Sequence, residues 1–226
     1  MKAQKWDIND ITDQTDRVAI VTGSNSGIGF ETARALALKN ATVVMVVRNL
    51  TKGREAAEKI HSESENAVVN VMQLDLSDLT SIRKFADEFK GSYSRLDLLI
   101  NNAGVMVPPY SKTTDGFELQ LGTNHFGHFA LTGLLIDLIK QTPNSRVVNV
   151  SSMAHAFGKL DFDDLNWETR KYKSGKLTET ARSPICTSRM NCRKSSATAH
   201  PASPWPPLTR VGPPPNYSAI RRSRRP

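Results

Sequence analysis

Five short apolar runs alternate with stretches of helical spacing between residues 18 and 151, and this alternation constrains the fold most strongly. Most of the runs are rich in Val, Ile and Leu and nearly uninterrupted, as expected for strands covered on both faces. The pattern predicts an α/β fold with a doubly wound parallel sheet. The expected strands are 18–22, 42–47, 68–74, 96–100 and 146–151, and the expected helices are 29–39, 52–62, 79–90 and 126–140.

The turn after the first expected strand reads Thr-Gly-Ser-Asn-Ser-Gly-Ile-Gly over residues 22–29. Glycines let the backbone turn sharply and approach a pyrophosphate, and the start of the helix adds free N–H groups and a positive dipole end. Many strand-to-helix turns need glycine for backbone geometry alone, so the turn by itself leaves both interpretations open. Its position after the first strand and before the first helix favours a dinucleotide site.

Further motifs follow along the chain: Asp75-Leu76, Asn-Asn-Ala-Gly at 101–104, Asn-His-Phe-Gly at 124–127 and Val-Val-Asn-Val-Ser-Ser at 147–152. Together with the glycine-rich turn, and in this order, they resemble the motifs of the short-chain dehydrogenase/reductase family. The resemblance covers about residues 14–172, and the stretch Asp-Phe-Asp-Asp-Leu-Asn-Trp at 161–167 is similar to the retinol-dehydrogenase-like branch. That branch is in turn similar to the oxidoreductase domain of the WW-domain oxidoreductase.

The resemblance implies a Rossmann-like nucleotide-binding domain over residues 1–172 and assigns roles within it. Asp75 would hydrogen-bond the adenine of the cofactor. Two residues would be catalytic: Asn124 would help hold a water chain that conducts protons, and Ser152 would hydrogen-bond the substrate oxygen. The implied cofactor-binding residues are Gly23, Ser24, Asn25, Ser26, Gly27, Ile28, Gly29, Arg48, Asp75, Leu76, Asn102, Ala103 and Gly104.

Arg48, at the end of the second expected strand, indicates NADP(H) as the cofactor. An NAD-selective enzyme would place an acid there for the ribose hydroxyl, whereas a guanidinium suits a 2′-phosphate. A solvated arginine at a strand end is the alternative. The implied function is an NADP-dependent oxidoreductase acting on a small-molecule substrate, a lipophilic alcohol, aldehyde or ketone; the alternative is an inactive nucleotide-binding remnant.

Tyr172 and Lys176 have the spacing of the tyrosine–lysine pair that this family uses for proton exchange, because residues four apart share a helical face. Their context argues against that role. Gly175 interrupts the pair, and the sequence that follows has no apolar stripe and meets Pro184. In the resembled branch a tyrosine commonly precedes the catalytic one, so we interpret Tyr172 as a decoy.

The genetic code suggests that a tyrosine–lysine pair is encoded in another reading register. Possible codons for residues 177–188, read from the third base of each, permit Tyr-Gly-Asp-Ser-Lys-Ile-Ala-Asn-Leu-Tyr-Phe, which resembles the family's catalytic helix. In the same register residues 205–212 permit Ala-Ala-Ala-His-Pro-Gly followed by Trp, which resembles the sixth strand and the turn beside the nicotinamide. A frameshift near residues 172–176 explains both strings.

The frameshift hypothesis predicts that residues 173–226 form a basic, disordered tail rich in Pro, Arg and Ser, without helical or strand periodicity. The family's C-terminal strands and helices would be missing, so apolar faces would stay open and the product would be marginal or aggregation-prone. Only an intact version could form the family's homo-oligomer. The chain as written is expected to be inactive.

Composition narrows the remaining possibilities. The formal net charge of +8 comes from the tail, since residues 173–226 carry 11 basic residues and one acidic residue. Nucleic-acid binding through this tail is an alternative, but frame-shifted coding sequence yields arginine without selection for binding, so we expect no nucleic-acid partner. His125 and His128 have no third ligand nearby in sequence, so we expect no metal. No apolar run suggests a signal peptide or membrane span, and the expected location is the cytoplasm.

Overall fold

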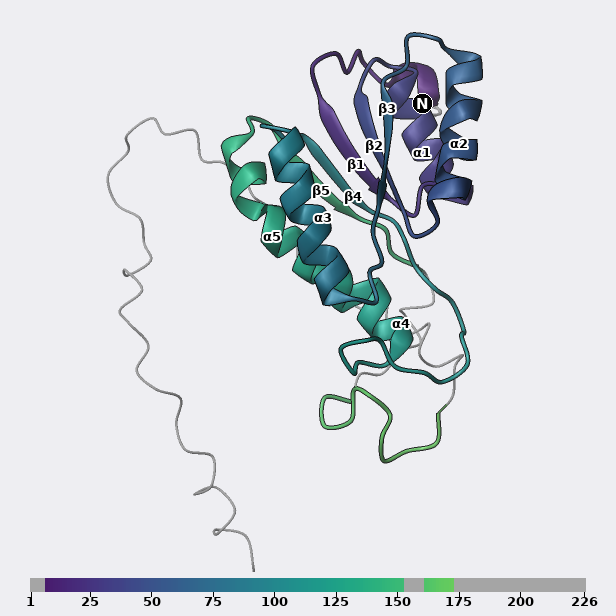
Figure 1. Cartoon of the computed structure of the whole chain (residues 1–226), viewed down its shortest axis with the longest axis vertical. Helices are drawn as coiled ribbons and strands as arrows, with labels where there is room; N and C mark the ends of the chain where they lie inside the picture. The colour runs from purple at the N-terminus through teal and green to yellow at the C-terminus, as the bar shows by residue number, and fades with distance from the viewer. Residues whose placement is uncertain (1–6, 153–160, 173–226) are drawn as a thin grey trace, which may run out of the picture. The chain divides into compact units, whose positions relative to one another are not determined.

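The computed structural model describes residues 7–152 and 161–172, and its centre is one parallel sheet (Figure 1). Its strands lie in the order β3-β2-β1-β4-β5, and every neighbouring pair is parallel. The predicted doubly wound α/β sheet is therefore confirmed. The strands are β1 (Val18–Thr22), β2 (Thr42–Val47), β3 (Val69–Gln73), β4 (Leu98–Asn101) and β5 (Arg146–Asn149).

Helices cover both faces of the sheet: α1 and α2 lie on one face, and α3 and α5 on the other (Figure 1). A short helix and a π-helical turn precede α5 without a break, which the sequence pattern did not predict. None of the described helices is long and apolar enough to cross a membrane. The bounds are η1 (Ile8–Asp10), α1 (Gly27–Ala37), α2 (Leu50–Glu63), α3 (Leu79–Ser92), α4 (Leu119–Leu121), η2 (Gly122–Phe126) and α5 (Gly127–Gln141).

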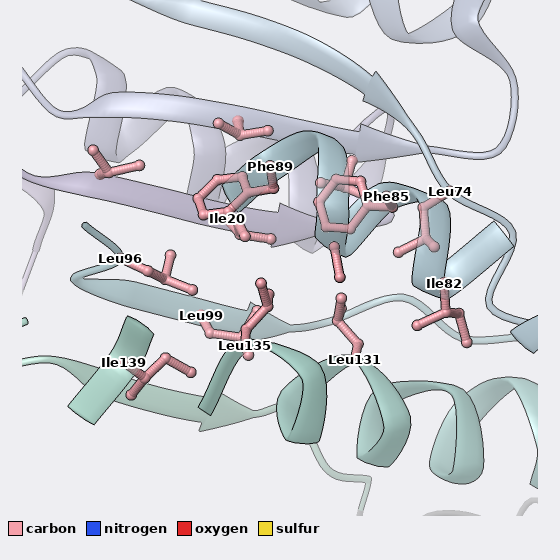
Figure 2. Packing of buried hydrophobic residues seen from close by; sticks show 14 of the residues in the cluster. Ile20, Leu74, Ile82, Phe85, Phe89, Leu96, Leu99, Leu131, Leu135 and Ile139 are labelled. Atoms are coloured by element: carbon pink, nitrogen blue, oxygen red, sulfur yellow. The ribbon is translucent and has the colours of Figure 1, made fainter. Parts of the chain in front are cut away.

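Two apolar cores result from the alternation of side chains along the strands. Ile20 points toward α3 and α5, where it joins Phe85, Phe89 and Leu135 (Figure 2). The neighbouring Ala19 and Val21 point the other way, into a core shared with α1 and α2. Burial on both faces explains why β1 and β2 read as continuous apolar runs.

Strand β4 begins two residues later than predicted, and Asp97, just before it, uses its side chain to bind the start of β1. Its carboxylate accepts a hydrogen bond from the Val18 N–H at 2.9 Å and pairs with the Arg95 guanidinium at 2.7 Å. The Asp97 side chain thus fixes the start of β1 beside β4. The predictions for the tail at 173–226 concern residues outside the described part of the chain.

Candidate functional site

A cleft of about 420 Å³ opens at the carboxyl ends of β1 and β4. These neighbouring strands are the point where the strand order reverses, because β2 and β3 lie to one side of β1 and β4 and β5 to the other. Open parallel sheets bind ligands at this position. The lining residues are Thr22, Gly23, Asn25, Ser26, Ile28, Gly29, Val46, Arg48, Leu74, Asp75, Leu76, Asn102, Ala103, Gly104, Val105, Leu119, Thr123 and Val150.

The N-terminus of α1 opens into this cleft without a side-chain cap. The N-cap residue Ser26 makes no capping hydrogen bond. By contrast, Asn49 caps α2 through the Lys52 N–H, and Asp78 caps α3 through the N–H groups of its first turn. An uncapped helix start presents free N–H groups and the positive dipole end to an anion.

Two glycines bring the backbone close enough to form this turn. Gly23 has φ +65°, and a Cβ on it would lie 2.8 Å from the Ala103 Cα. A Cβ on Gly29 would lie 2.4 Å from both the Asn102 Nδ2 and the Gly23 carbonyl oxygen. The glycines are therefore required by contacts across the floor of the cleft, and they leave its mouth free for a ligand backbone.

Hydrogen bonds join the two strand ends that form the floor. The Thr22 hydroxyl oxygen accepts from the backbone N–H groups of Asn102 at 2.9 Å and Ala103 at 3.0 Å. The Asn102 side-chain amide donates back to the Thr22 carbonyl at 2.9 Å. The segment that begins at Asn102 is thereby tied to the glycine-rich turn.

Asp75 and Arg48 lie on the β2–β3 side of the cleft. One oxygen of the half-buried Asp75 carboxylate accepts from the Ser77 N–H at 2.8 Å and the Ser77 hydroxyl at 2.6 Å, which holds the carboxylate in a fixed turn. Arg48 is exposed, and its backbone carbonyl accepts from the Gln73 side chain at 3.2 Å. The Arg48 side chain is thus a solvent-accessible cation at the rim.

The two residues predicted to be catalytic do not line the cleft. Asn124 is buried in η2, where its side chain accepts from the Val105 N–H at 2.8 Å and donates to the Val105 carbonyl at 2.9 Å. The structure thus gives the Asn124 side chain the task of holding Val105, and the predicted water chain stays a prediction. Ser152 follows β5 by three residues, at the same carboxyl edge of the sheet.

Tyr172 is held away from the cleft by a structural contact. Its hydroxyl donates to the Pro108 carbonyl at 3.1 Å and lies 3.3 Å from the fully buried Glu118 carboxylate. Burial, together with that carboxylate, raises the pKa of the Tyr172 phenol to about 12. A catalytic phenol in this chemistry needs a pKa nearer the working pH. These contacts favour the interpretation of Tyr172 as a decoy; Lys176 lies outside the described residues.

The structure brings the predicted cofactor residues together, with two exceptions. Ser24 and Gly27 belong to the turn but do not line the cleft. Ser24 is fully buried, and its hydroxyl oxygen has no hydrogen-bond partner in the described part of the chain. Gly27 has φ +59° and open space at its Cβ position, so the turn needs it for backbone conformation alone.

Sequence reasoning missed several lining residues, among them Thr22, Val105 and Thr123. Thr22 is the first residue of the glycine-rich motif but was not assigned to the cofactor site, and Val105 directly follows the motif at 101–104, so extending that motif by one residue would have found it. Thr123 belongs to η2, whose irregular geometry has no pattern in the sequence. Within residues 7–152 and 161–172 no three His, Cys, Asp or Glu side chains cluster to hold a metal ion.

The fold and the cleft define a Rossmann-type dinucleotide-binding domain, because an uncapped helix start, close-packed glycines and strand ends meet at the switch point. Comparison with known proteins makes the class specific. A family model described as short chain dehydrogenase matches residues 17–161. The chain belongs to the short-chain dehydrogenase family.

Curated relatives with the most similar sequences include two retinol dehydrogenases from Homo sapiens. Retinol dehydrogenase 12 is 53% identical over 154 residues, which is 68% of this chain and 49% of the relative. Retinol dehydrogenase 13 is 49% identical over 158 residues, covering 70% of this chain and 48% of the relative. The chain thus spans about half the length of the curated relatives it matches.

Solved structures agree with this assignment. An uncharacterised protein from Mycobacterium paratuberculosis is 45% identical with a TM-score of 0.69, covering 79% of this chain and 62% of that one. A short-chain dehydrogenase from Escherichia coli CFT073, solved in complex with NADPH, is 27% identical with a TM-score of 0.59, covering 74% and 68%.

Proposed function

We propose that this chain is the NADP(H)-binding part of an alcohol or carbonyl oxidoreductase, and that as written it binds cofactor without catalysing turnover. The observation that carries the proposal is the uncapped start of α1 at the switch-point cleft. A dinucleotide pyrophosphate is the ligand that such a helix start and glycine turn accommodate. The NADPH complex of the Escherichia coli relative supports the same assignment.

Different residues of the cleft would bind different parts of the cofactor. The N–H groups at the start of α1 would hold the pyrophosphate, and the Asp75 carboxylate would face the adenine. The exposed Arg48 guanidinium would pair with a 2′-phosphate, which distinguishes NADP(H) from NAD(H). The nicotinamide, when bound, supplies or accepts the hydride.

The described part of the chain places no tyrosine hydroxyl in the cleft for the proton half of the family's reaction. Three tyrosines are described, and none lines the cleft. The hydroxyl of Tyr93 contacts Asn70, that of Tyr110 donates to the Asn166 carbonyl, and that of Tyr172 donates to the Pro108 carbonyl. Oxidation of an alcohol requires a base for its hydroxyl proton as well as a hydride acceptor, so we infer that the chain as written is inactive.

A lipophilic substrate for the intact enzyme is supported by the names of the relatives, which are retinol dehydrogenases. No described residue of this chain distinguishes an alcohol from an aldehyde or ketone substrate. The substrate class therefore rests on the family branch alone.

Fluorescence titration of the full chain with NADPH tests the binding proposal. Gly29→Ala should abolish binding, because its Cβ would collide with Asn102 and Gly23 across the floor. Gly133→Ala in α5 is the matched control, since a Cβ there meets nothing within 4 Å and should leave binding unchanged. Equal NADPH binding by both variants, or none by the unaltered chain, would refute the proposal.

A further inference from the structure

His128 is buried in the first turn of α5 and contacts two parts of the floor of the cleft. Its Nε2 lies 2.9 Å from the Thr22 hydroxyl oxygen, and its Nδ1 lies 3.0 Å from the Asn124 carbonyl oxygen. Neither the fold pattern nor the proposed cofactor contacts explains a buried imidazole here. The inference below rests on the proposed cofactor site and concerns how its floor is held.

The chemistry of these two partners favours one arrangement of protons. A backbone carbonyl only accepts, so Nδ1 must carry the hydrogen that it donates to Asn124. In the neutral ring Nε2 is then a bare acceptor, and the Thr22 hydroxyl must donate to it. The other acceptor within reach of that hydroxyl, the Ile100 carbonyl, is more distant at 3.4 Å.

The Thr22 hydroxyl is thereby fully used. It has one hydrogen and two lone pairs, and the N–H groups of Asn102 and Ala103 both donate to its oxygen. With the hydrogen committed to His128, both lone pairs stay directed at these two amides. If Nε2 carried a hydrogen instead, three donors would compete for two lone pairs.

The same network reaches the far end of the floor. Asn124, whose carbonyl receives the His128 proton, holds the Val105 backbone through both atoms of its side-chain amide. Thr22 therefore holds one end of segment 102–105, Asn124 holds the other, and His128 joins the two. Gly127, the residue before His128, packs directly against Leu76, because a Cβ there would lie 2.4 Å from the Leu76 carbonyl oxygen.

We propose that His128, as the neutral Nδ1–H tautomer, is a positioning residue for the cofactor site. It closes a hydrogen-bonded ring through Thr22, segment 102–105 and Asn124, and this ring holds the floor against which the dinucleotide would lie. Removing the Nε2 acceptor frees the Thr22 hydroxyl hydrogen to turn, which weakens the two amide contacts and, through them, cofactor binding.

The wild-type chain gives a direct test that needs no variant. The ¹⁵N chemical shifts of the His128 ring in the full, labelled protein distinguish a protonated Nδ1 from a protonated Nε2. We expect the Nδ1–H tautomer at neutral pH. Finding the Nε2–H tautomer would overturn the assignment of protons and the proposal with it.

Amide hydrogen exchange then tests the positioning role without cofactor. His128→Phe keeps a flat ring but removes the acceptor, and exchange at Asn102 and Ala103 should rise about tenfold relative to amides of β2, the loss expected for about one hydrogen bond. His128→Gln, which restores a polar group, should recover part of the protection. Unchanged exchange at both amides in a folded His128→Phe chain would overturn the proposal; if that variant does not fold, His128→Gln and the tautomer decide.

His125→Phe is the matched control, one turn earlier. In the described part of the chain the His125 ring makes aromatic contacts with Phe126 and Phe129 and no hydrogen bond, so exchange at Asn102 and Ala103 should not change. In NADPH titrations His128→Phe should weaken binding about three- to tenfold, with His128→Gln between it and wild type. Failure of every chain, wild type included, to bind NADPH would refute the cofactor proposal, while the exchange result would still decide the role of His128.

Discussion

Strands β1 and β5 both carry adjacent apolar residues but have very different surroundings. Every residue of β1 is buried, whereas in β5 only Val147 is even partly covered. Val147 packs into the core beneath α3 and α5, and the adjacent Val148 is 44% exposed on the opposite face. The register places Val148 beside Ile100 of β4, which is only 7% exposed.

Among the described elements, the face of the sheet that packs against α1 is therefore covered as far as β4 but not at β5. A strand that is apolar on both sides is typical of a sheet covered on both faces. The apolar residues of β5 are thus typical of a strand covered on both faces, but no element within residues 7–152 and 161–172 covers Val148. The frameshift hypothesis predicts such a mismatch, because the residues permitted in the other register resemble a helix and a strand of the family.

Restoring the third-base register from about codon 173 should give the largest effect. The repaired chain would encode the Tyr-Gly-Asp-Ser-Lys helix, and we expect this helix to cover Val148 and to supply the tyrosine that exchanges the substrate proton. NADPH oxidation with a panel of lipophilic aldehydes and ketones should rise from the cofactor-only blank to measurable turnover. Sequencing the coding DNA across codons 170–180 should accompany this experiment, because it shows directly whether the reading frame shifts there.

Two controls separate repair of chemistry from repair of folding. Replacing the newly encoded tyrosine by phenylalanine should abolish turnover and leave NADPH binding intact, since only the phenol exchanges the substrate proton. Tyr172→Phe should leave turnover of the repaired chain unaffected. Turnover by the chain as written that disappears in Tyr172→Phe would instead make Tyr172 catalytic and end the frameshift account.

A pair of identical substitutions tests the contrast in coverage itself. Val44→Ala in β2 removes methyl groups from a fully buried site and should lower the free energy of unfolding by about 2 kcal/mol. Val148→Ala in β5 removes the same groups from an exposed edge and should cost less than about 0.5 kcal/mol. Urea unfolding with an unchanged m-value measures both. Similar losses at the two positions would show that Val148 is covered in solution.

The strands could be predicted well from the sequence because apolar runs and the turn residues that bound them are local features of the chain. The runs that became β1 and β2 have their predicted ends, since each is bounded by turn residues and buried on both faces. The end of β5 was overestimated by two residues, because the apolar run continues through Val150 after the ladder stops at Asn149. Apolar character alone does not reveal where backbone pairing ends.

The candidate site was predictable where a motif and a backbone turn coincide, as at Gly23 and Gly29. It was not predictable where a side chain acts through a distant partner. Thr22 meets His128 across 106 residues, and Asn124 meets Val105 through a π-helical turn that has no sequence pattern. The role of Tyr172 likewise depends on Glu118 and Pro108, which only the fold brings near it.

Arg48 follows β2, on the other side of β1 from β5. The effect of replacing Arg48 on cofactor binding should therefore not depend on restoring the elements next to β5. Arg48→Asp should reverse the preference for NADPH over NADH, weakening NADPH binding about tenfold, because it removes a cation and adds repulsion. Arg54, an exposed basic residue of α2 that does not line the cleft, gives the matched control in Arg54→Asp. Equal binding of both cofactors by the unaltered chain would argue against NADP(H) selectivity.

The smallest effect belongs to Tyr172, which lies beyond β5 and whose hydroxyl contacts Pro108 and Glu118 between β4 and α4. Tyr172→Phe should lower the free energy of unfolding by about 0.5–1 kcal/mol near pH 8, through loss of one hydrogen bond to the Pro108 carbonyl. NADPH affinity should be unchanged, since Tyr172 does not line the cleft. A change in affinity comparable to that of Arg48→Asp would contradict the structural role.

The pH dependence of that small loss distinguishes a structural phenol from a catalytic one. The folded chain raises the pKa of Tyr172 from its ordinary 10.0 to about 12, through burial and the neighbouring Glu118 carboxylate. A raised pKa means that the folded state favours the protonated phenol, so its stabilisation is complete below pH 10 and disappears as pH rises toward 12. The stability advantage of wild type over Tyr172→Phe, followed by urea unfolding at several pH values, should therefore be constant from pH 7 to 9 and shrink above pH 10. An advantage that instead grows as pH rises from about 7 toward 10 would reveal a lowered pKa, the property of a catalytic tyrosine, and would place Tyr172 in the chemistry after all.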